Sequence, residues 1–465
     1  MSSHSKTLRH EDDDKTSLHS RASGSSSTSY PEGTETSTLR YCQEPWDVYR
    51  PRVEKLCRTL WPPQQGLMSR VANSRILTWA RTIKFADAIL PGKHEPVIER
   101  MCGGDYNRIT GITLPRHPNL PCDRLILRKP REPNFGHPDR DEALLNFLRE
   151  KSSIPVVQSI AHDFSSDNPL ESPYVIQKRI PGESLEQMWP SLNQEQRSTI
   201  ACEVGAMFRT LFTLQSPVTG IADVPSSDET GSLNVIAFEL MDGCGGLIKD
   251  PGRTDLMKLR ESPNYKESTR SFFETQIARW RAHDVRRNLS EEAPSVQLWD
   301  KMLDIVREMD TANIFLQDSN CLCHTDLEPR NIMAETKSDG SIKITAILDW
   351  DEAVVAPNFV NCKPPLWLWR HETSEDTDED IDLWPLESAR GGEVPDTEDN
   401  RQLKQVFEES AGPEYVRMAY DQKYRLCRGL FALATRGLTC SDTWKAADAI
   451  LAEWKVLRES LIAKS

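Results

Sequence analysis

Apolar positions recur at helical spacing in several parts of the chain. After Asp139, the apolar side chains between Leu144 and Leu148 share one face of a predicted helix. A longer amphipathic helix is predicted between Ile200 and Leu211. From about residue 401 the chain is again predicted to be helical, with one apolar face between Trp444 and Trp454.

A shorter helical pattern lies near the N-terminus. Val53, Leu56 and Leu60 recur at helical spacing, and two prolines follow at 62–63. Because proline is tolerated in a first helical turn, the pattern predicts a helix that begins at about Pro51 and ends before the two prolines.

Strand patterns separate these helices. The run Leu125–Leu127 and the segment Pro173–Ile176 predict short buried strands. Beyond residue 330 the chain is predicted to form strand, turn and strand, with the turn at Ser338–Gly340 and alternating apolar residues from Ile342 onward.

Length and composition divide the chain further. Its 465 residues exceed one ordinary core, which predicts two packed lobes with tails. Residues 1–40 hold many Ser, Thr and charged side chains and almost no large apolar ones, so they are predicted to be disordered. The predicted domains are listed in chain order: a helical extension at 41–98, an N-lobe at 99–180 and a C-lobe at 181–465, with an exposed acidic loop near 372–400.

The net charge and the cysteine content limit which binding partners and which cellular location are expected. The formal net charge of −14 disfavours nucleic acid as a partner and suits a cationic small molecule. The 11 cysteines are scattered without a C-x-x-C pair, which is typical of reduced thiols in a cytoplasmic protein. The sequence shows no apolar run of membrane-spanning length, so no membrane partner is expected.

The segment with the clearest chemistry runs from Cys321 to Asn331 and contains the pattern H-x-D-x-x-x-x-N. This spacing is that of a kinase catalytic loop. Asp326 can orient and deprotonate an attacking hydroxyl, and the amide oxygen of Asn331 can reach a metal ion on the same phosphates. His324 is expected to have a structural role, donating hydrogen bonds within the loop.

A second acidic position follows the predicted strand–turn–strand. In Ile347–Asp351, a carboxylate at the end of a buried strand can project into a cleft and hold a divalent cation. Oxygen ligands of this kind suit Mg²⁺. We assign the metal to Asp349 and a supporting role to Asp351. Taken singly, each of these residues could equally cap a turn or end a strand, and the ordered combination is what favours a catalytic site.

These two segments resemble the aminoglycoside phosphotransferase family, within the protein-kinase-like superfamily, and its fungal-type members in particular. "HTDLEPRN" is similar to that family's catalytic loop, and "ILDWDEA" to its metal-binding segment. Protein kinases have HRD and DFG at these places, whereas this chain has Thr325 and Trp350-Asp351. The resemblance covers roughly residues 100–370.

The resemblance also implies nucleotide-binding residues in the N-lobe. "GGDYNRITGITL" is similar to the family's nucleotide-binding hairpin, which implies that Gly103, Gly104 and Asn107 contact ATP. Alone, the two glycines could form an ordinary hairpin turn. "LILRKP" resembles the strand that supplies a phosphate-binding cation, and either Arg128 or Lys129 could be that cation, because neighbouring strand residues face opposite ways.

Three further residues complete the implied ATP site. Glu142 would orient the cation, although its spacing from Asp139 also suits a helix cap. The backbone from Gln177 to Arg179 would meet the adenine edge.

The tryptophans of "PPLWLW" (364–369) are expected to pack in the core, and the alternative is that they line the acceptor pocket.

The sequence therefore predicts a two-lobed, protein-kinase-like α+β fold with a small N-lobe around an antiparallel sheet and a larger, mainly helical C-lobe. It predicts transfer of the γ-phosphoryl group of ATP, with Mg²⁺, to a hydroxyl of a small molecule. A protein kinase and a non-catalytic binding module with the same fold are the alternatives.

Overall fold

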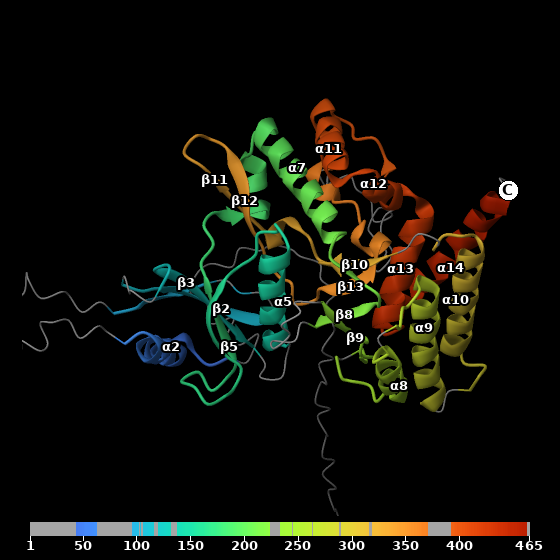
Figure 1. The fold of residues 1–465 in the computed structure, drawn as a ribbon, viewed down its shortest axis with the longest axis horizontal. Coiled ribbons are helices and arrows are strands. Elements are labelled where there is room, and N and C mark those ends of the chain that lie inside the picture. The colour runs from blue at the N-terminus through green and yellow to red at the C-terminus, as the bar shows by residue number, and fades with distance from the viewer. Residues whose placement is uncertain are drawn as a thin grey trace, which may run out of the picture.

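The computed structural model has a small lobe built on an antiparallel sheet and a larger, mainly helical lobe, which confirms the predicted fold class (Figure 1). The structure describes residues 43–62 and 95–462, apart from 102, 104–105, 116–119, 132–136, 224–232, 244, 263, 288–289, 316–318 and 371–391. The predicted disordered tail and the acidic stretch from Glu375 to Asp382 lie outside these residues.

The N-lobe is one five-stranded sheet in the order β1-β2-β3-β5-β4, with every neighbouring pair antiparallel. Its strands are β1 (Val97–Arg100), β2 (Asn107–Thr113), β3 (Arg124–Pro130), β4 (Ser159–Asp163) and β5 (Tyr174–Lys178). Helix α5 (Pro138–Lys151) connects β3 to β4. The strands predicted at Leu125–Leu127 and Pro173–Ile176 and the helix predicted after Asp139 are thus confirmed.

One face of this sheet packs against helix α2 (Trp46–Leu60) in a core of its own. Tyr49, Val53 and Leu56 of the helix meet Leu125 and Leu127 of β3, and all five are at most 1% exposed. The helix therefore belongs to the packing of the N-lobe.

The predicted start of α2 at Pro51 is wrong. The helix begins at Trp46 and carries Pro51 in its interior, where proline costs about 3 kcal/mol. The earlier turn buries Tyr49 completely, and a fully buried large apolar side chain contributes roughly 1.5–3 kcal/mol. The burial of Tyr49 before the proline offsets the cost of a proline inside the helix. The rule that proline favours the first helical turn does not take this burial into account.

The C-lobe contains two further sheets. The three-stranded sheet has the order β12-β11-β6 and consists of β6 (Glu183–Ser184), β11 (Ile332–Thr336) and β12 (Ile342–Ile347). The five-stranded sheet has the order β7-β10-β13-β8-β9 and consists of β7 (Gln215–Ser216), β8 (Gly220–Asp223), β9 (Asn234–Ile236), β10 (Asn320–Cys323) and β13 (Val354–Pro357). The hairpin of β11 and β12 turns at Gly340, which has φ of 83°, as the strand–turn–strand pattern predicts.

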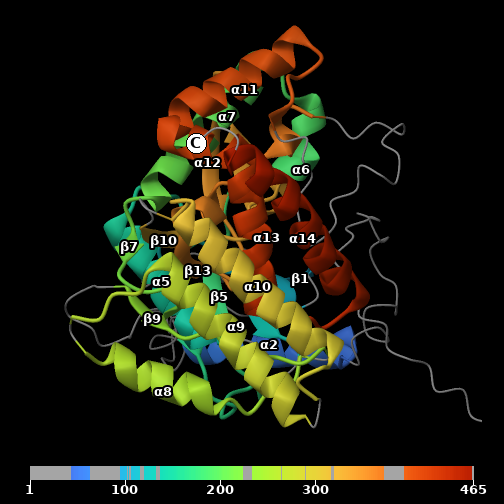
Figure 2. The ribbon, with the colours of Figure 1, turned by 90° about the vertical axis from the view of Figure 1, so that its right-hand side faces the viewer.

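Helices surround these sheets. Those before the segment 321–331 are α6 (Leu185–Met188), α7 (Gln194–Leu211), α8 (Pro251–Arg260), α9 (Thr269–Arg286) and α10 (Pro294–Thr311). Those after it are α11 (Glu398–Ala411), α12 (Pro413–Tyr420), α13 (Gln422–Arg436) and α14 (Ser441–Ile462), which confirms the predicted helical C-terminal part. Figure 2 shows α9, α10, α13 and α14 packed side by side.

The tryptophans of "PPLWLW" belong to this packing. Trp369 is 3% exposed and lies 5.5 Å, centroid to centroid, from Phe407 of α11. Trp367 meets Trp189 edge to face at 5.4 Å. Their packing in the core agrees with the expectation from sequence.

Two absences concern the described part of the chain. No disulfide joins two of its cysteines, and none of its helices is long and apolar enough to cross a membrane.

Candidate active site

The predicted catalytic loop begins where the buried strand β10 ends. His324 is 1% exposed, and its Nε2 donates to the carbonyl oxygen of Leu348 at 2.7 Å, while its ring meets Trp350 edge to face at 4.6 Å. Burial lowers the pKa of His324, which favours the neutral imidazole. Its hydrogen bond therefore leaves the loop and joins it to the segment that carries Asp349.

Asp326 lies in this loop with its carboxylate held on two sides. Nη2 of Arg330 donates to Oδ1 at 2.6 Å and to Oδ2 at 2.7 Å, and Nδ2 of Asn331 donates to Oδ2 at 2.9 Å. The preceding residue, Thr325, has φ of 59°, a strained value for a β-branched residue, and its hydroxyl donates to the carbonyl oxygen of Glu352. The Asp326 side chain stays 38% exposed, so a small molecule can reach it.

Asp349 follows β12 and Leu348. Its φ is 64°, a left-handed conformation that Asp adopts more readily than most residues. The N–H of Leu348 donates to the carbonyl oxygen of Asn331 at 2.8 Å, so the segments that carry Asn331 and Asp349 are bonded neighbours. Burial and the nearby Asp351 carboxylate raise the pKa of Asp349 to about 6, against the opposing effect of Arg128.

The chemistry of Asn331 and Asp349 fits a magnesium ion. The side-chain Nδ2 of Asn331 donates to the backbone oxygen and to Oδ2 of Asp326. Its amide oxygen is therefore the side-chain atom that can bind a metal ion. Burial and the neighbouring Asp351 carboxylate raise the pKa of Asp349, and a bound cation would favour its charged form. The described residues contain no cluster of three or more His, Cys, Asp or Glu side chains arranged for a metal. Mg²⁺ needs none, because it commonly takes one or two carboxylates together with phosphate oxygens and water.

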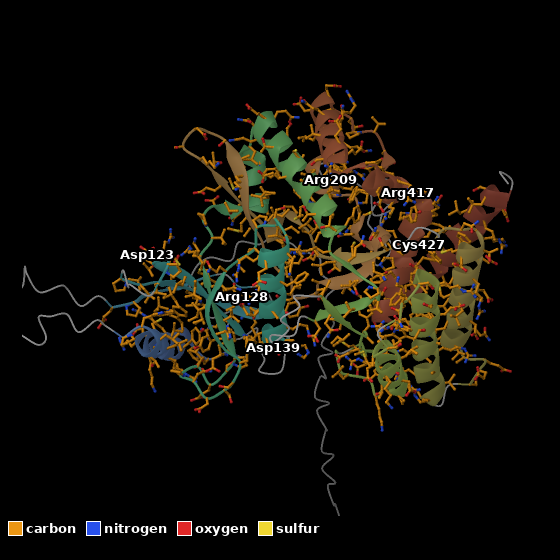
Figure 3. All side chains as sticks on the ribbon, viewed as in Figure 1. Asp123, Arg128, Asp139, Arg209, Arg417 and Cys427 are labelled. Carbon is orange, nitrogen blue, oxygen red and sulfur yellow. The ribbon has the colours of Figure 1, made fainter. Side chains whose placement is uncertain are left out.

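Arg128 and Lys129 have their side chains on opposite faces of the N-lobe sheet. Arg128, labelled in Figure 3, lines the cleft between the lobes, and its Nη2 lies 2.9 Å from Oδ2 of Asp351. Burial would lower the pKa of Arg128, but the carboxylates of Asp351, Asp349 and Asp141 outweigh it and the pKa is raised. Lys129 lies on the opposite face of the sheet, where burial lowers its pKa despite the nearby Glu44. It is not brought to the cleft.

Glu142 does not orient Arg128 in this structure. The Glu142 carboxylate is 7% exposed and accepts hydrogen bonds from Ser159 of β4 and, at 3.2 Å, from Asn146. It does not cap the helix either, because α5 begins at Pro138 after His137, without a side-chain cap. The strand β4 supplies a hydroxyl partner that no local pattern around Glu142 reveals.

The neighbouring Asp141 takes the place next to Arg128 instead. Burial, followed by the Asp351 carboxylate, raises the pKa of Asp141 to about 8, although Arg128 opposes the shift. Asp141 and Asp351 are the carboxylates of the N-lobe and C-lobe sides, respectively, that face the same cation.

A cavity of about 130 Å³ lies at this point in the cleft. It is lined by Tyr106, Asn107, Arg128, Pro130, His137, Pro138, Asp141, Glu142, Leu145, Val175, Gln177, Asp351 and Glu352. Ligand pockets for drug-sized molecules are about 300–1,000 Å³, so this cavity is smaller than such a pocket. The Arg128–Asp351 pair spans the cleft between the lobes.

The remaining predicted residues lie at different distances from this cavity. Asn107 and Gln177 line it. Arg179 instead makes an ion pair with Glu99 at 2.7 Å and is absent from the lining. Gly103 sits in the turn between β1 and β2, where a Cβ atom would come within 2.5 Å of the Asn107 carbonyl oxygen, so the hairpin itself requires glycine there. Gly104 lies outside the described residues.

Comparison with known proteins places the chain in a family. A model of the phosphotransferase enzyme family matches residues 118–380, which is more than half of the chain and includes the candidate site residues Arg128, Asp326 and Asp349. The chain belongs to the phosphotransferase enzyme family. This confirms the resemblance seen in the two motifs.

Curated relatives and solved structures are more distant. Subtelomeric hrmA-associated cluster proteins of two Aspergillus fumigatus strains are each 23% identical over 305 residues. The match covers 57% of this chain and 58% of each relative, so the chain spans a little more than half the length of the curated relatives it matches.

Two solved structures illustrate the structural similarity. The apo form of a thermostable mutant of the aminoglycoside phosphotransferase APH(4)-Ia has a TM-score of 0.39 and 14% identity, covering 79% of this chain and 95% of that chain. A Plasmodium vivax ethanolamine kinase has a TM-score of 0.37 and 12% identity, covering 81% of this chain and 85% of that chain.

Three contacts of the site were not predicted from sequence. They are the hydrogen bonds from Arg330 to Asp326, the proximity of Asp141 to Arg128, and the Arg128–Asp351 ion pair. Arg330 could have been found, because it lies four residues after Asp326 within the motif. The other two join separate elements, Arg128 on β3 with Asp141 on α5 and with Asp351 of the C-lobe, and leave no local signal.

Proposed function

We propose that this phosphotransferase moves the γ-phosphoryl group of ATP to a hydroxyl of a small molecule. The observation that supports the proposal is the bonded arrangement of Asp326, Asn331 and Asp349, which joins a partly exposed carboxylate to two oxygen ligands suited to Mg²⁺. An acceptor binding next to Asp326 and a nucleotide binding in the adjoining cleft would meet at these residues.

The transfer needs little chemistry from the protein beyond orientation and charge neutralisation. The acceptor hydroxyl oxygen forms a bond to the γ-phosphorus, and the bond from that phosphorus to the β,γ-bridging oxygen breaks. Asp326 orients the hydroxyl and takes up its proton, and ADP leaves. Mg²⁺ held by Asn331 and Asp349 would neutralise charge on the phosphate oxygens.

Arg128 supplies the cation of the N-lobe side in this proposal. Its guanidinium now contacts the Asp351 carboxylate at 2.9 Å, and phosphate oxygens would take over these hydrogen bonds when ATP enters. Asn107 and the β5 backbone at Gln177 border the same cavity and are proposed to contact the nucleotide. Gly103 and Gly104 retain their proposed place in the hairpin over the phosphates.

The acceptor class rests on charge. The net charge of −14 favours a cationic acceptor by long-range attraction. The Glu328 and Glu352 carboxylates, near Asp326 in the chain and in the fold, are each within 4.0 Å of a cationic side chain, Lys363 and Arg436 respectively. The local acidic charge is therefore partly balanced, and the acceptor's identity must come from experiment.

The test is Mg²⁺-dependent consumption of ATP by the full chain, with and without a protein-free small-molecule extract of fungal cells. Wild type is expected to respond to the extract. Asp326→Asn is expected to lose roughly 10³-fold in turnover, because a positioned acid–base group contributes about 10²–10⁴-fold. ATP affinity, measured by calorimetry, should change little.

Other outcomes would favour other functions. Equal turnover by Asp326→Asn contradicts the proposed role of this residue. ATP binding without any consumption favours a non-catalytic binding module, and labelled phosphate on added proteins but on no small molecule favours a protein kinase.

A further inference from the structure

Arg330 is a charged residue inside the candidate site that the proposed function leaves without a role. It lies in the short 3-10 turn Pro329–Asn331, between the residues proposed to bind acceptor and metal. Its Nη2 donates to both carboxylate oxygens of Asp326, at 2.6 and 2.7 Å. These are short, charge-assisted contacts on the atom pair proposed to receive the acceptor's proton.

Stability does not account for this contact. The side chains of Arg330 and Asp326 are 40% and 38% exposed, and ion pairs between exposed side chains contribute little to folding. The backbone of the loop is already held by other bonds. The N–H of Glu328 donates to the backbone carbonyl oxygen of Asp326 at 3.0 Å, and that of Asn331 donates to the backbone carbonyl oxygen of Glu328 at 2.9 Å.

The contact does determine how the Asp326 carboxylate is presented. A carboxylate has about four lone-pair positions, two on each oxygen. Oδ2 accepts from Arg330 and Asn331, whereas Oδ1 accepts from Arg330. Among the described residues, the remaining lone pair of Oδ1 is thus the one left for an acceptor hydroxyl. Because Nη2 bridges both oxygens, it restricts rotation of the carboxylate about its Cβ–Cγ bond.

We propose that Arg330 is a positioning residue that holds the Asp326 carboxylate with Oδ1 directed at the acceptor hydroxyl. The inference rests on the proposed phosphotransfer and adds to it a residue that acts through Asp326. It requires that loss of the arginine slows the transfer step while ATP binding stays intact, since Arg330 is not among the residues that line the ATP cleft.

The experiment compares Arg330→Gln and Arg330→Lys with wild type. Turnover is followed with γ-labelled ATP, Mg²⁺ and a protein-free small-molecule extract of fungal cells, and ATP affinity and thermal unfolding are measured separately. A matched control is Arg50→Gln, which removes another i, i+4 ion pair, to Glu54 at 3.0 Å, in helix α2 and outside the cavity lining.

Arg330→Gln is expected to lower kcat by roughly 10²-fold, as small misplacements of reacting groups do. KM for ATP, ATP affinity and the unfolding temperature should match those of wild type. Arg330→Lys should recover about a tenth of the wild-type kcat, because an ammonium keeps the charge but lacks the planar guanidinium geometry. Arg50→Gln should match wild type throughout.

The opposite results are equally clear. Wild-type kcat in Arg330→Gln, a lysine variant no better than the glutamine variant, or an equal loss of ATP affinity and kcat would each overturn the inference. If Arg330→Gln fails to fold, the folded lysine variant provides the same comparison of kcat with ATP affinity. Wild type that is no more active than Asp326→Asn would refute the proposed function and this inference together, whereas active wild type with an unaffected Arg330→Gln refutes this inference alone.

Discussion

The two walls of the cleft hold their charged residues in different ways. On the C-lobe wall, Asp326, Asn331 and Asp349 belong to neighbouring segments joined by backbone and side-chain hydrogen bonds. On the N-lobe wall, Arg128 extends from β3 across the cleft to Asp351. In the proposed function, the first arrangement exists before ATP binds, whereas the second changes when ATP enters.

This difference suggests how the work of a phosphotransferase is divided between its lobes. Phosphoryl transfer depends on accurate alignment, so residues near the reacting atoms gain from a preformed network. A phosphate-binding cation is kept in its position by a carboxylate partner as long as no phosphate is bound. The phosphate then replaces the carboxylate as its partner. The predictions below test each wall in turn.

The largest effect is expected on the C-lobe wall. Asp349→Asn should lower Mg²⁺-dependent turnover by roughly 10³-fold, because a neutral amide is a much weaker Mg²⁺ ligand. Asn also tolerates the left-handed backbone at this position, where φ is 64°. Turnover is measured over a range of Mg²⁺ concentrations.

The stability of the Asp349→Asn variant provides a control for its folding. The pKa of Asp349 is raised in the fold to about 6, so the native state binds the proton more tightly than the unfolded chain does. The charge therefore destabilises the fold increasingly as pH rises through this range. Asp349→Asn should be at least as stable as wild type at pH 8, and a clear loss of stability there would contradict this account of the site.

An intermediate effect is expected from the two neighbouring cations of β3. Arg128→Gln should raise KM for ATP by about tenfold, which corresponds to the loss of one charge-assisted contact with phosphate. Lys129→Gln should change KM by less than about twofold, because Lys129 lies on the face of the sheet toward α2. Initial rates at varied ATP concentration measure both, and equal effects of the two substitutions would show that the cleft does not distinguish them.

The smallest effect concerns the acidic pair around Arg128. Burial raises the pKa of Asp141 from 3.8 to about 8, so its charge lowers stability increasingly as pH rises between these values. Asp141→Asn should raise the unfolding temperature by roughly 2 °C or more at pH 8.5, and by less at pH 4.5. Asp139→Asn, an exposed residue of the same first helical turn, is the control and should show no such gain.

The sequence was most informative where chemistry and spacing lie on one short segment. His324, Asp326 and Asn331 belong to one loop, and the buried strands on either side of it are visible as apolar runs. The helix that carries Glu142 was likewise predicted from its apolar period. The role of Glu142 was not, because its hydrogen-bond partner Ser159 comes from the next strand, β4.

The sequence by itself therefore determined several of the helices and strands, the family and the order of the acidic residues Asp326, Asp349 and Asp351 along the chain. The tertiary structure decided which of two adjacent cations faces the cleft. Strand alternation sends Arg128 and Lys129 to opposite faces, but the packing of α2, a helix much earlier in the chain, makes one face a core. It also decided which carboxylates meet Arg128, since Asp141 and Asp351 come from different lobes and approach each other only when the lobes pack. Contacts between distant segments depend on the whole fold, and no local pattern of residues encodes them.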